Sequence, residues 1–156
     1  MNEGGTAMAS GQYSLSMILP LYNEIEILEA NLQVIDDFLA RHFEDYEILI
    51  VESGSTDGSA ELCDRLAGRF ERVKIIHEGA RNGIGSATRV GFQRASKDLA
   101  WRYAIDLPCP LEAILEALPL FAKYKARIKP SVIKVLPLPE WGAAITMALA
   151  NWIIPH

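Results

Sequence analysis

The segment that decides the fold runs from Ile48 to Ser59 and has the sequence Ile-Leu-Ile-Val-Glu-Ser-Gly-Ser-Thr-Asp-Gly-Ser. Its four branched apolar residues in a row are typical of a strand buried on both faces, as in a parallel sheet. Ligands of open α/β sheets bind at the carboxyl ends of the strands, so the acid and the Gly/Ser turn that follow suit a ligand with hydroxyls and phosphates. Taken alone, the segment is better explained as an ordinary strand-turn-helix connection, because Asp, Ser and Gly cap many helices.

The same alternation of strand and helix patterns continues on both sides of this segment. We predict strands at 15–19, 46–51, 73–77 and 99–105, with Pro20 closing the first. Each is followed by a helical pattern, and the predicted helices begin near residues 23, 57, 85 and 111. Asn23 is the expected N-cap of the first helix, with Glu26 completing a capping box. This order predicts an α/β fold: a largely parallel sheet of about four to five strands with helices on both faces.

Composition limits the classes of function. The chain has 156 residues, half of them hydrophobic, and a net charge of −5, which argues against a nucleic-acid partner because such proteins need a basic surface. Cys63 and Cys109 lie far apart with no second ligand nearby. A disulfide framework or zinc site is therefore not expected, and a cytoplasmic location fits.

The two ends of the chain differ from the middle. Residues 1–13 are rich in Gly, Ala and Ser without an apolar run, so we expect a disordered lead-in and no signal peptide. The domain is predicted to span 14–123. In the tail, 124–156, a basic cluster precedes a predicted strand at 132–136 and an apolar segment at 141–154 that is too short to span a membrane. The basic cluster fits a solvated linker better than contact with anionic lipid, and membrane association stays open.

Polar residues follow each of the predicted strands. Glu52 and Asp106 stand at two strand ends, and the loops 22–24 and 81–83 follow the other two. Because the carboxyl ends of parallel strands share one edge of a sheet, we expect Glu52 and Asp106 to approach each other there. Asp106 could hold a divalent cation that bridges two phosphates, and Arg81 could bind a phosphate.

Two other kinds of site are not supported. The run from Gly83 to Gly85 lacks the third glycine of a dinucleotide-binding fingerprint, because Thr88 stands in its place, and it follows the third strand instead of the first. The three histidines cannot be paired with a nucleophile into a Ser-His-Asp or Cys-His constellation.

Four motifs in this order resemble those of family-two glycosyltransferases: Ile18–Glu24, Val51–Ser59, Arg81–Ala87 and Asp106. The dolichol-phosphate mannosyltransferase type, a polyprenyl-phosphate glycosyltransferase with a GT-A fold, is the most similar, over residues 14–123. The resemblance implies a nucleotide-diphosphate sugar, a divalent cation (Mg or Mn) and an acceptor such as a polyprenyl phosphate or membrane-surface group. It implies a metal ligand at Asp106 and a nucleotide-sugar site made of Pro20, Tyr22, Glu24, Glu52, Ser53, Arg81, Asn82 and Asp106.

The chain departs from the family pattern at three points. Ser53 replaces a second acid after the second strand, and the Asp-x-Asp metal motif is reduced to Asp106-Leu107-Pro108. The catalytic base and acceptor site of the family lie in a second half of the domain, near whose start this chain ends, so no catalytic residue is predicted. Two hypotheses follow: a nucleotide-sugar-binding domain of a glycosyltransferase, or a truncated, non-catalytic binding module that acts through a protein partner held by the apolar tail.

Overall fold

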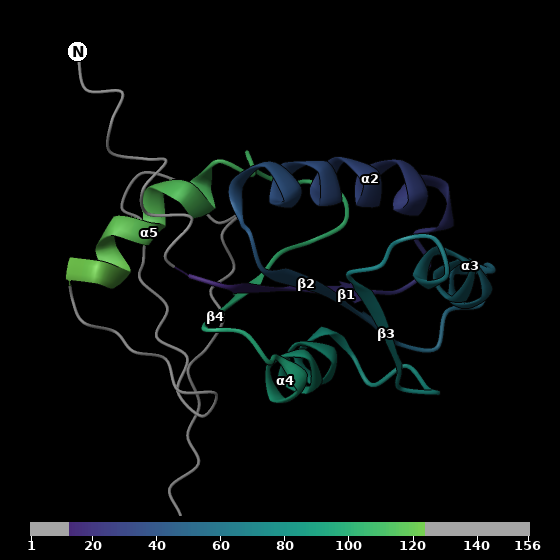
Figure 1. Ribbon diagram of the computed structural model, residues 1–156. Coiled ribbons are helices and arrows are strands. Elements are labelled where there is room, and N and C mark those ends of the chain that lie inside the picture. Colours follow the sequence, from purple (N-terminus) through teal and green to yellow (C-terminus); the bar gives the residue numbers. More distant parts are fainter. Residues whose placement is uncertain (1–12, 124–156) are drawn as a thin grey trace, which may run out of the picture.

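The computed structural model describes residues 13–123. The predicted strand at 132–136 and the apolar segment at 141–154 lie outside this range, as does nearly all of the lead-in. The described chain alternates strand and helix (Figure 1), in the order β1 (Leu15–Leu21), α2 (Ile25–His42), β2 (Tyr46–Glu52), α3 (Ser59–Ala67), β3 (Val73–His77), α4 (Ile84–Arg94), β4 (Leu99–Arg102) and α5 (Ala113–Lys123).

The four described strands form one sheet in the order β3-β2-β1-β4, and every pair is parallel. The strands β1 and β2 are in register over their whole length, from Leu15 opposite Tyr46 to Leu21 opposite Glu52. The carboxyl ends of these two central strands therefore lie side by side. The predicted fold class, a parallel α/β sheet with helices on both faces, is confirmed.

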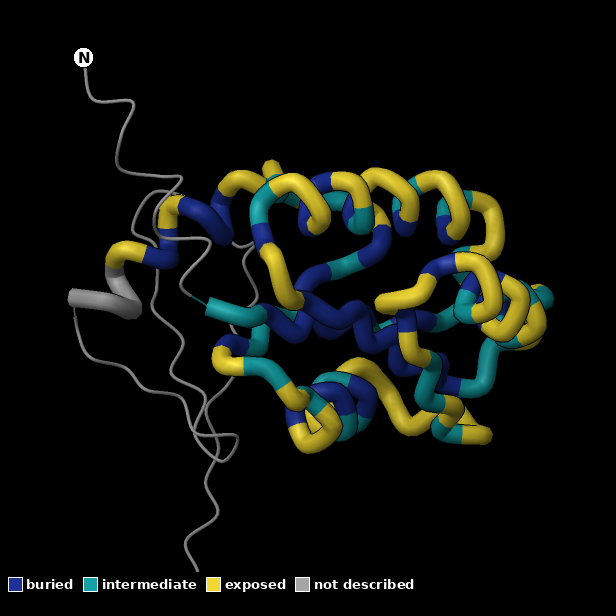
Figure 2. Tube along the Cα trace, viewed as in Figure 1, coloured by how far each residue is buried: buried dark blue, intermediate teal, exposed yellow. Residues whose placement is uncertain are grey.

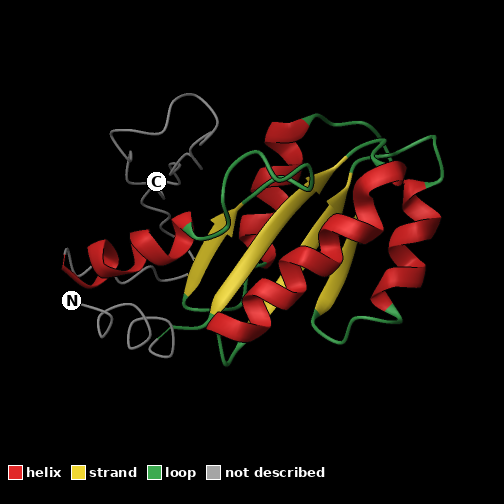
Figure 3. Cartoon of the chain, turned by 90° about the horizontal axis from the view of Figure 1, so that it is seen from above, coloured by secondary structure: helices red, strands yellow, loops and turns green. Residues whose placement is uncertain are grey.

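Helices cover the two faces of the sheet in different ways. α2 packs over one face and α4 lies against the other, with α3 beside β3 and α5 beyond β4 (Figures 1 and 3). The larger core lies on the α2 face, where alternate residues of β1 such as Met17 and Leu19 are fully buried. Figure 2 shows the resulting layers, with buried strands between helices whose outer surfaces are exposed.

The α4 face has a thin core, because small residues bring the helix close to the sheet. Gly91 faces β1 so closely that a Cβ at this position would overlap the side chain of Ile18. Ile18, Leu49 and Phe92 form the small core on this side. Ala87 and Gly91, both of them buried, are the small residues of α4 that allow this close approach.

Several predicted boundaries were wrong. Pro20 does not close the first strand; it lies within β1 opposite Val51. The N-cap of α2 is Glu24 instead of Asn23, and the Glu24 side chain makes no capping hydrogen bond. β4 ends at Arg102 instead of residue 105, and α5 begins at Ala113 and contains Pro119. Within the described part of the chain, no helix is both long enough and apolar enough to cross a bilayer.

Candidate functional site

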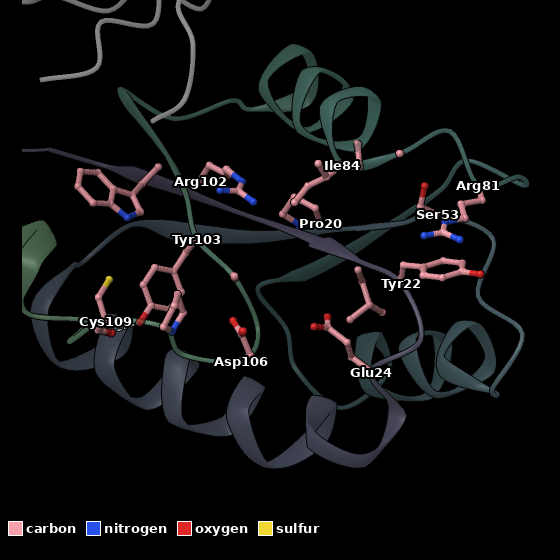
Figure 4. A pocket seen from close by; sticks show the side chains of 16 residues that line it. Pro20, Tyr22, Glu24, Ser53, Arg81, Ile84, Arg102, Tyr103, Asp106 and Cys109 are labelled. Atoms are coloured by element: carbon pink, nitrogen blue, oxygen red, sulfur yellow. Dashed lines mark hydrogen bonds between the residues drawn. The ribbon is translucent and has the colours of Figure 1, made fainter. Parts of the chain in front are cut away.

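A cavity of about 530 Å³ opens at the carboxyl edge of the sheet, between the end of β1, the start of α4 and the segment that follows β4 (Figure 4). Ligands of open α/β sheets bind at this edge. Six of the eight residues predicted to bind a nucleotide sugar line the cavity: Pro20, Tyr22, Glu24, Ser53, Arg81 and Asp106. The other two, Glu52 and Asn82, do not line it.

The loop after β1 is held by the loop after β2. Asn23 has a positive φ of 53° and donates its backbone N–H to Ser55 Oγ at 3.0 Å. Its side-chain oxygen accepts a hydrogen bond from Thr56 N at 2.8 Å. Asp57 accepts a further bond from Ile25 N at 3.1 Å, so a residue 32 positions later satisfies the start of α2. These bonds fix the position of the neighbouring cavity residues.

Glu24 combines a fixed backbone with a perturbed carboxyl group. Its N–H donates to Ser59 Oγ at 3.1 Å, and its side chain points across the cavity toward Asp106 (Figure 4). Burial raises the pKa of Glu24 from 4.5 to about 7, with further contributions from the negative charges of Asp106 and Asp57. Burial and the nearby carboxylate disfavour the ionised form of Glu24. A cation bound between the two acids would stabilise that form.

Arg81 lies over a tyrosine at the rim. Its guanidinium carbon is 4.3 Å from the centre of the Tyr22 ring, within the range of a cation–π contact. The loop that carries Arg81 is held close to the loop after β2 because Gly54 faces it: a Cβ on Gly54 would lie 2.8 Å from the carbonyl carbon of Ala80. Gly54 also has a φ of +71°, which favours glycine.

Ser53 lies beside the carboxylate of Glu78, the residue that follows β3. Its hydroxyl donates to Glu78 Oε2 at 2.7 Å, and the hydroxyl of Ser86 donates to Glu78 Oε1, also at 2.7 Å. Burial opposes ionisation of Glu78, but hydrogen bonds from Ser86, Ser53 and Asn82 outweigh it and lower the pKa. A carboxylate from the end of β3 thus lies beside the position where the family pattern has its second acid.

Glu52 and Asp106, which we expected to approach each other, both stand at the carboxyl edge of the sheet, but in different surroundings. Glu52 ends β2 and is 2% exposed; its carboxylate accepts the N–H of Ser55 and lies 3.1 Å from Nδ1 of His77. Asp106 follows β4, on the other side of β1, and is exposed in the cavity. The two acids therefore occupy the same edge, while Asp106 alone of the pair faces the cavity.

The sequence did not predict that β4 contributes to the cavity. Trp101 and Arg102 of β4 and Tyr103, which follows the strand, line the cavity. The two aromatic residues also belong to or pack against the main core. Burial lowers the pKa of Arg102, while Asp106 acts in the opposite direction. The available signal was Arg102 itself, a charged residue inside an otherwise apolar strand pattern, four positions before Asp106.

The donors in the cavity fit a hard divalent cation. The positions two residues before and after Asp106 are Ala104 and Pro108, which carry no carboxylate. Glu24, on the other side of the cavity, is the second carboxylate there. Among the described residues, no group of three or more His, Cys, Asp or Glu side chains gathers as a metal site. Two carboxylates suit Mg²⁺ or Mn²⁺ when phosphate oxygens and water supply the other ligands.

Comparisons with known proteins identify the family of the chain. The family model described as glycosyl transferase family 2 matches residues 16–135. The chain belongs to this family. The match runs past Lys123, where we predicted the domain to end.

Relatives of known name share the same part of the chain. The dolichol-phosphate mannosyltransferase of Pyrococcus furiosus is 36% identical over 100 residues, which cover 64% of this chain and 28% of the relative. The undecaprenyl-phosphate 4-deoxy-4-formamido-L-arabinose transferase of Yersinia enterocolitica is 36% identical over 101 residues, covering 64% and 31%. This chain thus spans less than a third of the length of either relative.

A solved structure supports the fold. The mannosyltransferase PcManGT from Pyrobaculum calidifontis, in complex with GDP-Man and Mn²⁺, superposes with a TM-score of 0.58 at 22% identity. The match covers 77% of this chain and 34% of that one. The described domain therefore has the glycosyltransferase α/β fold called GT-A.

Proposed function

We propose that residues 14–123 form the donor-binding domain of a glycosyltransferase, which binds a nucleotide-diphosphate sugar for transfer to an acceptor. The observation that carries this proposal is the cavity at the carboxyl edge, where Glu24 and Asp106 face each other and Arg81 and Arg102 also lie. Carboxylates for a cation and guanidinium groups for phosphate oxygens are what a metal-bound diphosphate requires.

Each part of the cavity has a role in this proposal. Tyr22 and Pro20, with Ser53, line the side that would contact the nucleoside. Arg81, already stacked on Tyr22, presents its planar guanidinium to the diphosphate. Arg102 adds a second positive charge from the floor of the cavity. The chain's own residues thus bind and orient the donor.

A divalent cation, Mg²⁺ or Mn²⁺, is part of the proposal. Asp106 would hold it, with Glu24 as the second carboxylate. When bound, such a cation supplies charge stabilisation for a departing diphosphate. The PcManGT complex contains Mn²⁺ together with GDP-Man, which supports the use of this kind of cofactor.

The acceptor is proposed from the relatives. Two of them are named for dolichol phosphate and undecaprenyl phosphate, so we propose a polyprenyl phosphate, reached at a membrane surface, as the acceptor of the full reaction. Glu112 and Glu116 are exposed and do not line the cavity, so neither is assigned as a catalytic base. A phosphate acceptor is already ionised and does not need one.

The binding part of the proposal is tested by calorimetric titration of the chain with GDP and with UDP, each with and without Mn²⁺. We expect one of them to bind, and to bind more tightly with Mn²⁺. Asp106→Asn should remove most of the Mn²⁺ effect, whereas Glu116→Gln, a control at an exposed acid outside the cavity, should leave it unchanged. A chain that binds neither nucleotide at millimolar concentration would contradict the proposal.

The catalytic part is tested by transfer of radiolabelled sugar to a polyprenyl phosphate, compared with a full-length relative. We expect the isolated chain to bind donor but to transfer sugar far more slowly than the relative, of which the matched part covers less than a third. Losing even one contact that stabilises the transition state costs about 10²–10³ in rate. Turnover equal to that of the relative would show that this chain is sufficient for the reaction.

A further inference from the structure

His77, at the end of β3, lies between two carboxylates. Its Nδ1 is 3.1 Å from Glu52 Oε2 and its Nε2 is 2.9 Å from Asp64 Oδ1. The two acids come from different elements, β2 and α3, and differ in burial: the Glu52 side chain is 3% exposed and that of Asp64 is 68% exposed. The imidazole thus connects a buried acid at the carboxyl edge with one at the surface.

This arrangement requires the protonated ring. Ionised carboxylates only accept hydrogen bonds, and a neutral imidazole donates from one nitrogen only. Both contacts of His77 are therefore satisfied together only by the imidazolium. The hydrogen bonds that the ring donates to Asp64 and then to Glu52 raise the pKa of His77, which agrees with the geometry.

The contacts continue from His77 to the cavity. The second oxygen of Glu52, Oε1, accepts the backbone N–H of Ser55 at 2.5 Å. Ser55 Oγ in turn accepts the N–H of Asn23 at 3.0 Å. Asn23 lies between Tyr22 and Glu24, which both line the cavity. A continuous series of hydrogen bonds therefore joins Asp64, at the surface, to the loop that forms one wall of the cavity.

We propose that His77 is a positioning residue for the donor site: it holds Glu52, which fixes Ser55 and thereby the loop that carries Tyr22 and Glu24. This inference rests on the proposed function. It gives Glu52, which does not line the cavity, a structural role at the end of β2. A buried carboxylate that loses a donor is costly and reorients, and the loop bound to it moves with it.

Two substitutions of His77 separate positioning from simple packing. His77→Asn keeps an amide donor near the place of Nδ1, next to Glu52, but loses the contact with Asp64. His77→Phe keeps a ring of similar shape and loses both donors. His42→Asn is the matched control, because that histidine packs on Phe38 at the far end of α2.

The first measurement is calorimetric titration of each variant of the 156-residue chain with GDP or UDP in the presence of Mn²⁺. We expect His77→Phe to weaken binding by about tenfold, equivalent to about 1.4 kcal/mol. His77→Asn should restore most of that loss, and His42→Asn should bind like the wild type. Wild-type affinity in His77→Phe, or equal losses in the Phe and Asn variants, would overturn the proposal.

The second measurement needs no nucleotide. In NMR spectra recorded across a pH series, the Ser55 amide should shift with the same midpoint as the His77 ring. The titratable groups that face this ring are Glu52 from β2 and Asp64 from α3; Cys63, beside Glu52, stays protonated because burial, followed by the charge of Glu52, raises its pKa to about 12. Asp64→Asn, at an exposed position, should move both midpoints to lower pH.

The two measurements distinguish failure of this inference from failure of the proposed function. A Ser55 amide that does not follow His77 would overturn the positioning role, whatever the nucleotide titrations show. Absence of nucleotide binding in the wild type at every pH would overturn the proposed function, and the amide titration would still decide whether His77 controls the loop. If His77→Phe does not fold, the amide test is still available, because it uses only the wild type and Asp64→Asn.

Discussion

Gly54→Ala should both destabilise the fold and weaken nucleotide binding. Gly54 lies in the turn after β2 with a φ of +71°, and a Cβ there would lie 2.8 to 2.9 Å from three backbone atoms of Ala80 and Arg81. Backbone atoms cannot rotate away as the end of a side chain can. The added methyl group would therefore push apart the two loops that carry Ser53 and Arg81, which both line the cavity.

The expected loss of stability has two parts. A left-handed backbone costs a residue with a Cβ roughly 1–2 kcal/mol, and an extra methyl group in a filled space costs about 1–3 kcal/mol. The sum is roughly 2–5 kcal/mol. Gly79→Ala provides a matched control, because Gly79 has a φ of +73° and nothing within 4 Å of an added Cβ. It should lose only the first part.

The assay is urea unfolding of both variants beside the wild type, followed by titration with GDP or UDP and Mn²⁺. The effect of removing a glycine from the unfolded chain is the same in both variants and cancels in the comparison. We expect Gly54→Ala to be less stable than Gly79→Ala by about 1–3 kcal/mol, and it alone should bind nucleotide more weakly. Equal losses of stability and unchanged binding in both variants would refute the argument that the two loops are held in contact through Gly54.

Three further predictions concern the core and the pH dependence of stability. Gly91→Ala should cost about 1–3 kcal/mol in urea unfolding, because its Cβ overlaps Ile18, and the double variant with Ile18→Ala should lose less than the sum of the two single losses. Burial opposes ionisation of Glu47, but hydrogen bonds led by that of Lys74 outweigh it and lower the pKa to about 2; the stability that this acid contributes should be lost as the pH falls from about 4.5 to 2, and Glu47→Gln should flatten this slope. Because the pKa of Glu24 is raised to about 7, its ionisation opposes folding at higher pH, so Glu24→Gln should be more stable than the wild type at pH 8 and equal to it at pH 4 in the same assay.

The existence and order of the elements were predictable, because long apolar patterns and the turns between them recur along the chain. The end of the first strand was not predictable, and Pro20 shows why. Proline is excluded from central strands because it lacks an N–H, yet β1 lies between β2 and β4. β4 stops pairing at Arg102 opposite Ile18, and the Tyr103 N–H donates to the Ile18 carbonyl. Pro20, two residues on, points its nitrogen to the same side, where the neighbouring strand has ended and no donor is needed.

The cap of α2 was mispredicted for a related reason. Asn23 followed by Glu26 has the local pattern of a capping box, but the side chain of Asn23 binds Thr56 instead. The N–H of Ile25 is satisfied by Asp57, from the loop after β2. Local sequence rules assume partners within one turn, whereas this helix begins at a contact between two loops that are brought together only by the parallel pairing of β1 and β2. The same contact builds one wall of the cavity.

The candidate site was predictable as far as strand ends define it, since six predicted residues line one cavity. The sequence could not indicate how the charges of these residues affect one another. Glu24 and Asp106 are 82 positions apart, and each would be an ordinary acid alone; facing each other, with Glu24 partly buried, they form a pair whose full ionisation opposes folding. A cation and a diphosphate placed between these acids and the guanidinium groups of Arg81 and Arg102 would remove that cost. The binding energy of the donor would thus offset the cost of placing these two acids together, which is a common relation between stability and function.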